Sequence, residues 1–217
     1  MRTFPALCLA TVAVASCGHR EPSPVAATPQ AMQPVDDFEN AARGTLSRDW
    51  YTVQPAYTVE VGQVSTRDDL RSTTLAVWRA EAPLDHFAEI KVGDLAGGSF
   101  DEFRSLQVFV RLKSLGGDER VSFQYSSDAR RYEIRHEGRS ARVLAHSSRS
   151  APPELGDILR LEARGDRYVG LLNGRPLLET EGPRLEGRHA GFAVGIDLFT
   201  VGIPKRVVDA WAAGALE

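Results

Sequence analysis

The segment Asp157–Glu181, DILRLEARGDRYVGLLNGRPLLETE, decides the fold class. From Leu159 to Arg164, apolar residues alternate with charged ones, which places all the apolar side chains on one face of a strand. Gly165-Asp166 and Asn173-Gly174 interrupt the apolar runs. An Asn-Gly pair between such runs is a strong hairpin signal, because both turn positions need positive φ. The segment therefore predicts antiparallel strands joined by tight turns.

The same pattern covers the chain from Asp36 onward, where short runs with a period of two are separated by Gly, Pro, Asp and Asn. We find no convincing amphipathic helix. About a dozen short strands with regular turns are typical of an all-β, antiparallel two-sheet sandwich or jelly roll. In the run Ser105–Leu112, one side is expected to face the core and the other to face outward. The expected inward residues are Val108, Val110 and Leu112, and the outward ones are Gln107, Phe109 and Arg111.

A longer stretch, Pro152–Val194, resembles the late hairpins of concanavalin A-like (laminin G-like) jelly rolls, and specifically the domain named 3-keto-disaccharide hydrolase. The elements that carry the resemblance are turns and strand ends. They are Gly156-Asp157, Gly165-Asp166, Asn173-Gly174, Gly191-Phe192, the early Asp36–Glu39 followed by Trp50, and the late Val207–Trp211. The resemblance implies that the last strand pairs with the first. It identifies a fold rather than a reaction.

The amino end reads as an export signal. Residues 1–16 combine Arg2 with an apolar run that is shorter than the roughly 20 residues of a membrane-spanning helix. Val14–Cys17 resembles the lipobox of bacterial lipoproteins, in which the cysteine is lipidated and the signal is cut just before it. Cleavage at an ordinary site such as after Ala15 is the alternative. Lipidation of Cys17 would leave the mature chain without a disulfide, because Cys8 departs with the signal.

These features divide the chain into a signal (1–16), a lipidated cysteine with a flexible linker (17–35) and one jelly-roll domain (36–217). Several acyl chains on Cys17 would anchor the protein to a bilayer stably. We expect a bacterial cell-envelope location. Gly18 after the cysteine, where enterobacterial lipoproteins retained in the inner membrane have Asp, favours the outer membrane.

The composition and charge of the chain argue against nucleic-acid binding. The formal net charge is −3 and 42% of residues are hydrophobic, so the chain can bury a core but has no dense basic run for nucleic acid. We expect a monomer that does not bind nucleic acid.

Catalytic signals are weak. Glycoside hydrolases on this fold carry carboxylates on alternate positions of one strand, as in E-x-D-x-E. Here Glu133 and Glu137 share a face, but Arg135 stands between them. The histidines of the domain have no metal-chelating spacing. Calcium is a candidate at the doubled acids Asp36-Asp37 and Asp68-Asp69, which are also ordinary turn residues. No other cofactor, metal site or catalytic residue is expected.

Sugar binding needs aromatic faces and planar hydrogen-bonding groups on the outer side of a sheet. The candidates on the expected non-core side are Trp78, Phe109, Arg111, Gln124 and Arg135. Tyr125, Tyr132, Trp50 and Trp211 are expected in the core. Three functions remain open: a tethered, non-catalytic domain that binds glycan or another envelope component, a hydrolase or lyase acting on sugar derivatives, and a structural envelope lipoprotein.

Overall fold

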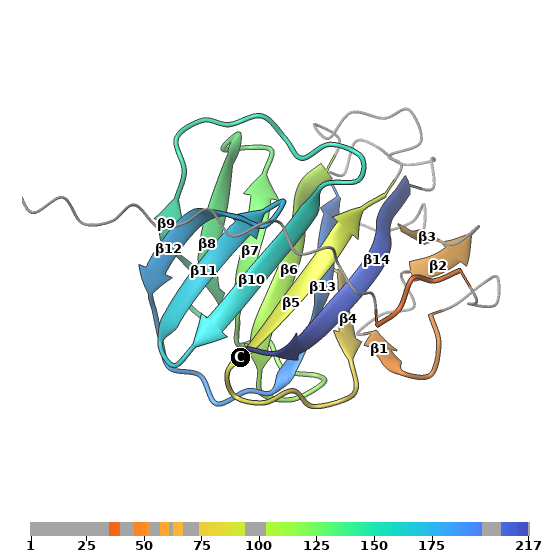
Figure 1. The fold of residues 1–217 in the computed structure, drawn as a ribbon, viewed down its shortest axis with the longest axis horizontal. Helices are drawn as coiled ribbons and strands as arrows, with labels where there is room; N and C mark the ends of the chain where they lie inside the picture. Colours follow the sequence, from red (N-terminus) through yellow and green to blue (C-terminus); the bar gives the residue numbers. More distant parts are fainter. Residues whose placement is uncertain are drawn as a thin grey trace, which may run out of the picture.

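The computed structural model describes residues 35–39, 46–52, 57–60, 63–66, 74–93, 103–196 and 205–216. Within these ranges the chain forms fourteen strands and no helix, arranged in two antiparallel seven-stranded sheets that face each other (Figure 1). The expected signal segment, Cys17, the linker up to residue 34 and the Asp68-Asp69 pair lie outside the described residues. The predicted all-β sandwich is confirmed.

Sheet I has the strand order β1-β4-β13-β6-β7-β8-β9. Its strands are β1 (Trp50–Thr52), β4 (Thr74–Trp78), β13 (His189–Ile196), β6 (Phe103–Leu112), β7 (Arg120–Ser126), β8 (Arg131–Glu137) and β9 (Arg142–His146). Sheet II has the order β12-β11-β10-β5-β14-β3-β2. Its strands are β12 (Arg175–Glu181), β11 (Arg167–Leu172), β10 (Ile158–Arg164), β5 (His86–Val92), β14 (Lys205–Ala215), β3 (Gln63–Thr66) and β2 (Tyr57–Glu60).

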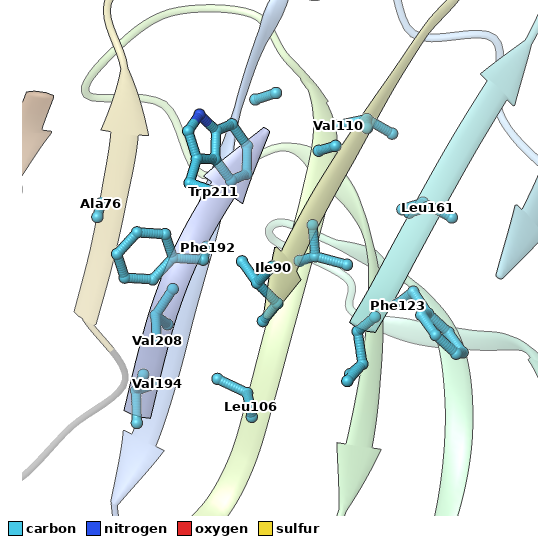
Figure 2. Close-up of a cluster of buried hydrophobic side chains, with 14 of the residues drawn as sticks. Ala76, Ile90, Leu106, Val110, Phe123, Leu161, Phe192, Val194, Val208 and Trp211 are labelled. Carbon is cyan, nitrogen blue, oxygen red and sulfur yellow. The ribbon is translucent and has the colours of Figure 1, made fainter. Parts of the chain in front are cut away.

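The hydrophobic core lies between the sheets, as the alternation predicts. In β10, Leu159, Leu161 and Ala163 are all fully buried, and the two predicted turns are present at Gly165 and Asn173, each with positive φ. Figure 2 shows core side chains from both sheets meeting in this space, including those of β13 in sheet I and of β14 in sheet II. Tyr125 and Tyr132 are core residues too, as expected.

The first and last segments of the domain meet, as the resemblance implies. Asp36 forms an antiparallel bridge with Trp211, and the backbone N–H of Trp211 donates to the Asp36 carbonyl at 2.9 Å. The Asp36 carboxylate accepts a hydrogen bond from the Trp50 indole Nε1 at 2.9 Å. Trp50 in turn packs edge-on against Trp211, with ring centroids 5.4 Å apart. Both tryptophans are buried, which confirms their predicted role in closing the core.

A β-bulge in β6 changes the expected side-chain pattern. His189 of β13 pairs with Leu112 and Gly191 pairs with Phe109, so a single β13 residue lies opposite Val110 and Arg111. Arg111 takes a positive φ of 64° at this point. The prediction that Leu112 faces the core was therefore wrong. Beyond the bulge it packs with Phe109 in a second, smaller apolar cluster.

Candidate functional site

The outer face of sheet I, from β6 to β9, carries most of the polar side chains that the fold buries. The pairing registers place the outward side chains of these strands, polar and apolar, in rows that cross the four strands, and two of these rows form the candidate site. One row is Gln107, Gln124, Glu133 and His146, and the next is Phe109, Ser122, Arg135 and Val143. We call this surface the β6–β9 face.

Three of these polar residues are almost completely buried although they point away from the core. The exposed fraction is 5% for Gln107, 5% for Gln124 and 2% for Glu133. Polar groups with so little contact with water are costly unless hydrogen bonds satisfy them. Their hydrogen bonds therefore determine which of these buried polar groups are satisfied within the protein and which are not.

Glu133 is the centre of a closed set of hydrogen bonds. One carboxylate oxygen accepts from Arg131 Nε at 2.8 Å, and the other accepts from Arg135 Nη1 at 3.0 Å. Gln124 Nε2 donates to the second oxygen at 3.4 Å. These donors compensate the buried charge and fix the positions of both arginines and of the glutamine.

Arg135 also bridges Glu133 to Glu137. Its Nε donates to a Glu137 oxygen at 3.1 Å, and the Ser122 hydroxyl donates to the same oxygen at 3.3 Å. Burial alone would lower the pKa of Arg135, but the two carboxylates outweigh it and raise that pKa. Glu133 and Glu137 share a face, as the sequence indicates, and Arg135 between them forms hydrogen bonds with both.

Two acceptor atoms on this face have no partner. The side-chain oxygens of Gln107 and Gln124 are buried and make no hydrogen bond. The amide of Gln124 cannot simply be turned round, because its NH₂ group faces the Glu133 carboxylate. The two residues are direct cross-strand partners on β6 and β7, so their side chains are neighbours. Two neighbouring acceptors therefore lie buried on this side of sheet I without a hydrogen bond.

Phe109 lies on the same face but does not present its ring to solvent. Its exposed fraction is 0%. The Arg120 guanidinium lies 5.4 Å from the ring centroid, a cation–π contact. On the β13 side, a Cβ on Gly191 would come within 2.6 Å of the ring, so only glycine leaves room for it. Phe109 thus supports the face from one end rather than offering a stacking surface.

Two of the other predicted candidates are not on this face. Trp78 is partly buried and packs against the main core, 5.1 Å from the Trp50 ring, so its expected outward placement was wrong. The outward residue of β4 is Val77, which belongs to the second apolar cluster. Because both sides of β4 are apolar, its alternation cannot tell which side is inner.

Arg111 was also expected to face outward, and the β6 bulge turns it toward sheet II instead. Its Nη2 donates to Asp85 at 3.2 Å and to the Gly165 carbonyl at 3.1 Å, and its backbone N–H donates to His86 Nε2 at 3.4 Å. The side chain is 2% exposed. Arg111 therefore joins the two sheets at one end of the sandwich.

The structure thus brings Gln124, Arg135 and Phe109 together, and adds Gln107, Glu133 and Arg131. The signal for the added residues was present in the sequence. Gln107 has the same strand parity as Phe109, and Glu133 has the same parity as Arg135. The alternation within each strand does not specify the register between neighbouring strands, so the sequence could not predict which of these residues are adjacent.

The outer face of sheet II carries a second polar cluster. The Arg160 guanidinium lies 3.6 Å from the centroid of the Phe87 ring and donates to Glu162 at 2.8 Å and to Glu89 at 3.3 Å. Burial raises the pKa of Glu89. The positive charge of Arg160 and its hydrogen bond act in the opposite direction and lower that pKa in part. A small hollow beside it is lined by Glu162, Arg164, Arg167 and Val169. Every polar group of the Arg160 cluster thus has a partner inside the protein.

Within the described ranges, no group of three or more His, Cys, Asp or Glu side chains is placed to hold a metal ion. Asp36, one of the calcium candidates, uses its two carboxylate oxygens for the N–H groups of Phe38 and Trp50. Among the same residues, no helix is long and apolar enough to cross a bilayer.

Comparison with known proteins identifies the architecture. No family model and no curated protein matches the sequence. Solved structures do match: carbohydrate-binding module CBM66 from Bacillus subtilis superimposes with a TM-score of 0.62 at 14% identity, over 79% of this chain and 99% of that one. The chain has a concanavalin A-like jelly-roll fold.

Two further structures show the range of this fold. The exoplasmic/lumenal domain of VIP36, in a form bound to Ca²⁺ and Man3GlcNAc, gives a TM-score of 0.61 at 11% identity over 79% of this chain and 85% of that one. A protein from work on endo-acting O-glycanases, which members of the human gut microbiota express to initiate mucin breakdown, gives 0.59 at 9% identity, over 85% of this chain and 100% of that one. At such identities the likeness establishes the fold, and function has to be argued from the site.

Proposed function

We propose that this protein binds carbohydrate on the β6–β9 face and is held at a bacterial membrane by a lipid on Cys17. The first part is supported by the pair of buried, unsatisfied oxygens of Gln107 and Gln124. Arg135, which Glu133 and Glu137 hold in place, supplies a planar donor beside them. Two of the structural neighbours described above are named as binding carbohydrate or as glycan-bound, which is consistent with this use of the fold.

The binding proposal is tested on a glycan array with the full-length protein and its Gln124→Leu variant. We expect the wild type to bind at least one glycan class and the variant to bind it more weakly. Gln63→Leu is the matched control, because Gln63 also has a buried unpaired oxygen but lies on β3 of sheet II. Running the array with calcium and with EDTA tests whether calcium takes part. A folded protein that binds no glycan would favour the structural envelope role.

The anchoring proposal is supported by the sequence Val14–Cys17. It predicts an amino-terminal peptide that begins at Cys17 and carries acyl chains, which mass spectrometry can detect. Cys17→Ser should move the protein from the membrane fraction to the soluble fraction, and density-gradient separation tests the proposed outer-membrane location. An unmodified Cys17 would refute the anchor while leaving the binding proposal intact.

Hydrolysis is the second candidate function, favoured by the likeness to the O-glycanase study protein. Its difficulty is that Glu133 is held by two arginines and a glutamine, and Glu137 by Arg135 and Ser122. A glycosidase acid or nucleophile has to be free to act on the substrate. Release of reducing ends from any bound glycan, abolished in Glu133→Gln, would establish this function.

A further inference from the structure

We propose that the β6–β9 face selects a neutral, hydroxyl-rich sugar unit and discriminates against both carboxylated and amino sugars. This inference rests on the proposed carbohydrate binding. It adds the chemical class of the ligand.

Three buried polar atoms on this side of β6 and β7 have no partner: the oxygens of Gln107 and Gln124, which are acceptors, and the Nε of Arg120, which is a donor and lies against the Phe109 ring. A ligand that satisfies the two neighbouring glutamine oxygens must donate. Vicinal hydroxyls of a sugar can donate to two neighbouring acceptors at once. The carboxylate group of an acidic sugar has no hydrogen to give them, so only the ring hydroxyls of such a sugar could donate.

The charges along the outer side of β8 balance one another. Its outward residues alternate between arginine and glutamate: Arg131, Glu133, Arg135 and Glu137. Each neighbouring pair is closed by an ion pair, with N–O distances of 2.8, 3.0 and 3.1 Å. Both arginines of β8 therefore already have carboxylate partners. The third arginine of the face, Arg120, is buried against the Phe109 ring and donates to the Asp118 carbonyl, so its charge does not lie at the surface where an anion would bind.

The same arrangement also disfavours a cation. An ammonium group could use the glutamine oxygens, but it would lie beside the guanidinium groups of Arg131 and Arg135. The carboxylate between them is already neutralised. A hydroxyl avoids both penalties, because it donates to a glutamine oxygen and can accept from an arginine N–H that the ion pairs leave unused.

Few aromatic rings occupy these positions. In the two rows that define the face, the Phe109 ring is fully covered, and His146 at the β9 end carries the one exposed ring. Binding should therefore depend mainly on hydrogen bonds to individual hydroxyls.

The test compares four soluble saccharides in three charge classes: neutral dextran and galactan, anionic polygalacturonate and cationic chitosan oligomers. Binding of the full-length protein in a mild detergent is measured by affinity electrophoresis and calorimetry at 50 and 500 mM NaCl. We expect binding only to a neutral polymer, with little dependence on salt. Gln107→Leu and Gln124→Leu should each weaken binding about 3- to 10-fold, the loss of one net hydrogen bond.

The outcomes separate this inference from the function on which it rests. Binding of polygalacturonate or chitosan that depends on Gln124 would refute the neutral class but support carbohydrate binding at this face. Neutral binding that neither glutamine variant changes would mean that water satisfies the two oxygens, and would overturn the inference. Binding to none of the four saccharides would refute this inference, and the glycan array then decides the carbohydrate-binding proposal separately. Gln63→Leu controls for general effects, and thermal unfolding confirms that each variant is folded.

Discussion

Glycine at position 191 shows how a single residue determines the shape of the β6–β9 face. A Cβ at this position would lie 2.0 Å from the Ala76 carbonyl oxygen and 2.6 Å from the Phe109 ring. The absent side chain lets β13 lie close to β4 while the Phe109 ring occupies the space above it. The site therefore depends on a residue that carries no functional group.

We predict that Gly191→Ala lowers the free energy of unfolding by about 3 kcal/mol or more, because neither the backbone oxygen nor the covered ring can move away easily. Urea denaturation gives the measurement. Gly116→Ala is the control: its Cβ would lie 3.6 Å from the Tyr51 hydroxyl, an ordinary contact, so stability should stay within about 1 kcal/mol of wild type. Equal stability of the two variants would contradict the crowding described above.

His86 is a buried histidine that the fold holds in its neutral form. Its Nδ1 donates to the Pro83 carbonyl at 2.8 Å, and its Nε2 accepts from the Arg111 backbone N–H. Burial lowers the pKa of His86 below its usual value of 6.5, although the two backbone carbonyls oppose this. A protonated ring could no longer accept from Arg111.

The sign of the pH effect follows from this lowered pKa. As pH falls below about 6.5, the unfolded chain binds a proton that the folded chain does not yet take up, so stability decreases. We predict that the free energy of unfolding falls between pH 7 and pH 5, and that NMR titration gives a His86 pKa below 6.5. A His86 pKa above 6.5 would show that the ring is not held as described.

At the level of elements, β8 is a strand whose outer side is stabilised by its own ion pairs. Residues two apart on a strand share a face, so the alternation of arginine and glutamate gives a continuous chain of contacts. Glu133 occupies the centre of this chain and is the most buried carboxylate in it.

We predict that Glu133→Gln destabilises the domain by about 1–3 kcal/mol, because it leaves two partly buried guanidinium groups with a weaker acceptor. Chemical denaturation measures the change. Glu179→Gln is the matched control on sheet II, where the Glu179–Arg167 pair is over half exposed on both sides. The control variant should unfold at the wild-type denaturant concentration. Similar losses in both would argue that burial does not set the strength of these pairs.

At the level of the whole molecule, the first described segment, residues 35–39, packs into the centre of the sandwich. Asp36 bridges to β14 through Trp211 and to β1 through the Trp50 indole. Phe38, two residues later, is buried in the core against Trp50. The segment is thus part of the domain rather than of a linker.

Two truncations test where the domain begins. A chain starting at Val35 keeps these contacts and should unfold at the same denaturant concentration as the full-length protein. A chain starting at Asn40 loses Phe38 and the Asp36 contacts, and we expect it to be less stable by about 3–5 kcal/mol, the usual cost of removing a buried phenylalanine. Equal midpoints would mean that the segment contributes nothing to folding.

The fold was largely predictable from local pattern. Alternation in β10, the Asn173-Gly174 turn and the matching ends at Asp36 and Trp211 all lead to an antiparallel sandwich, because strand geometry and turn chemistry act over a few residues. Gln124 and Arg135 were placed correctly on the outer side for the same reason. Their role in binding stays a prediction.

The remainder of the site depends on contacts between strands that are far apart in the chain. The β6 bulge moved Arg111 inward and Leu112 outward, and it arises from how β13 pairs with β6. Trp78 lies against the core because both sides of β4 are apolar, and tertiary packing rather than the alternation of β4 determines which side faces inward. The adjacency of Gln107 and Gln124 exists only through the β6–β7 register. A period of two is a property of one strand, whereas register, bulges and the choice between two apolar faces come from the assembly of the sheets.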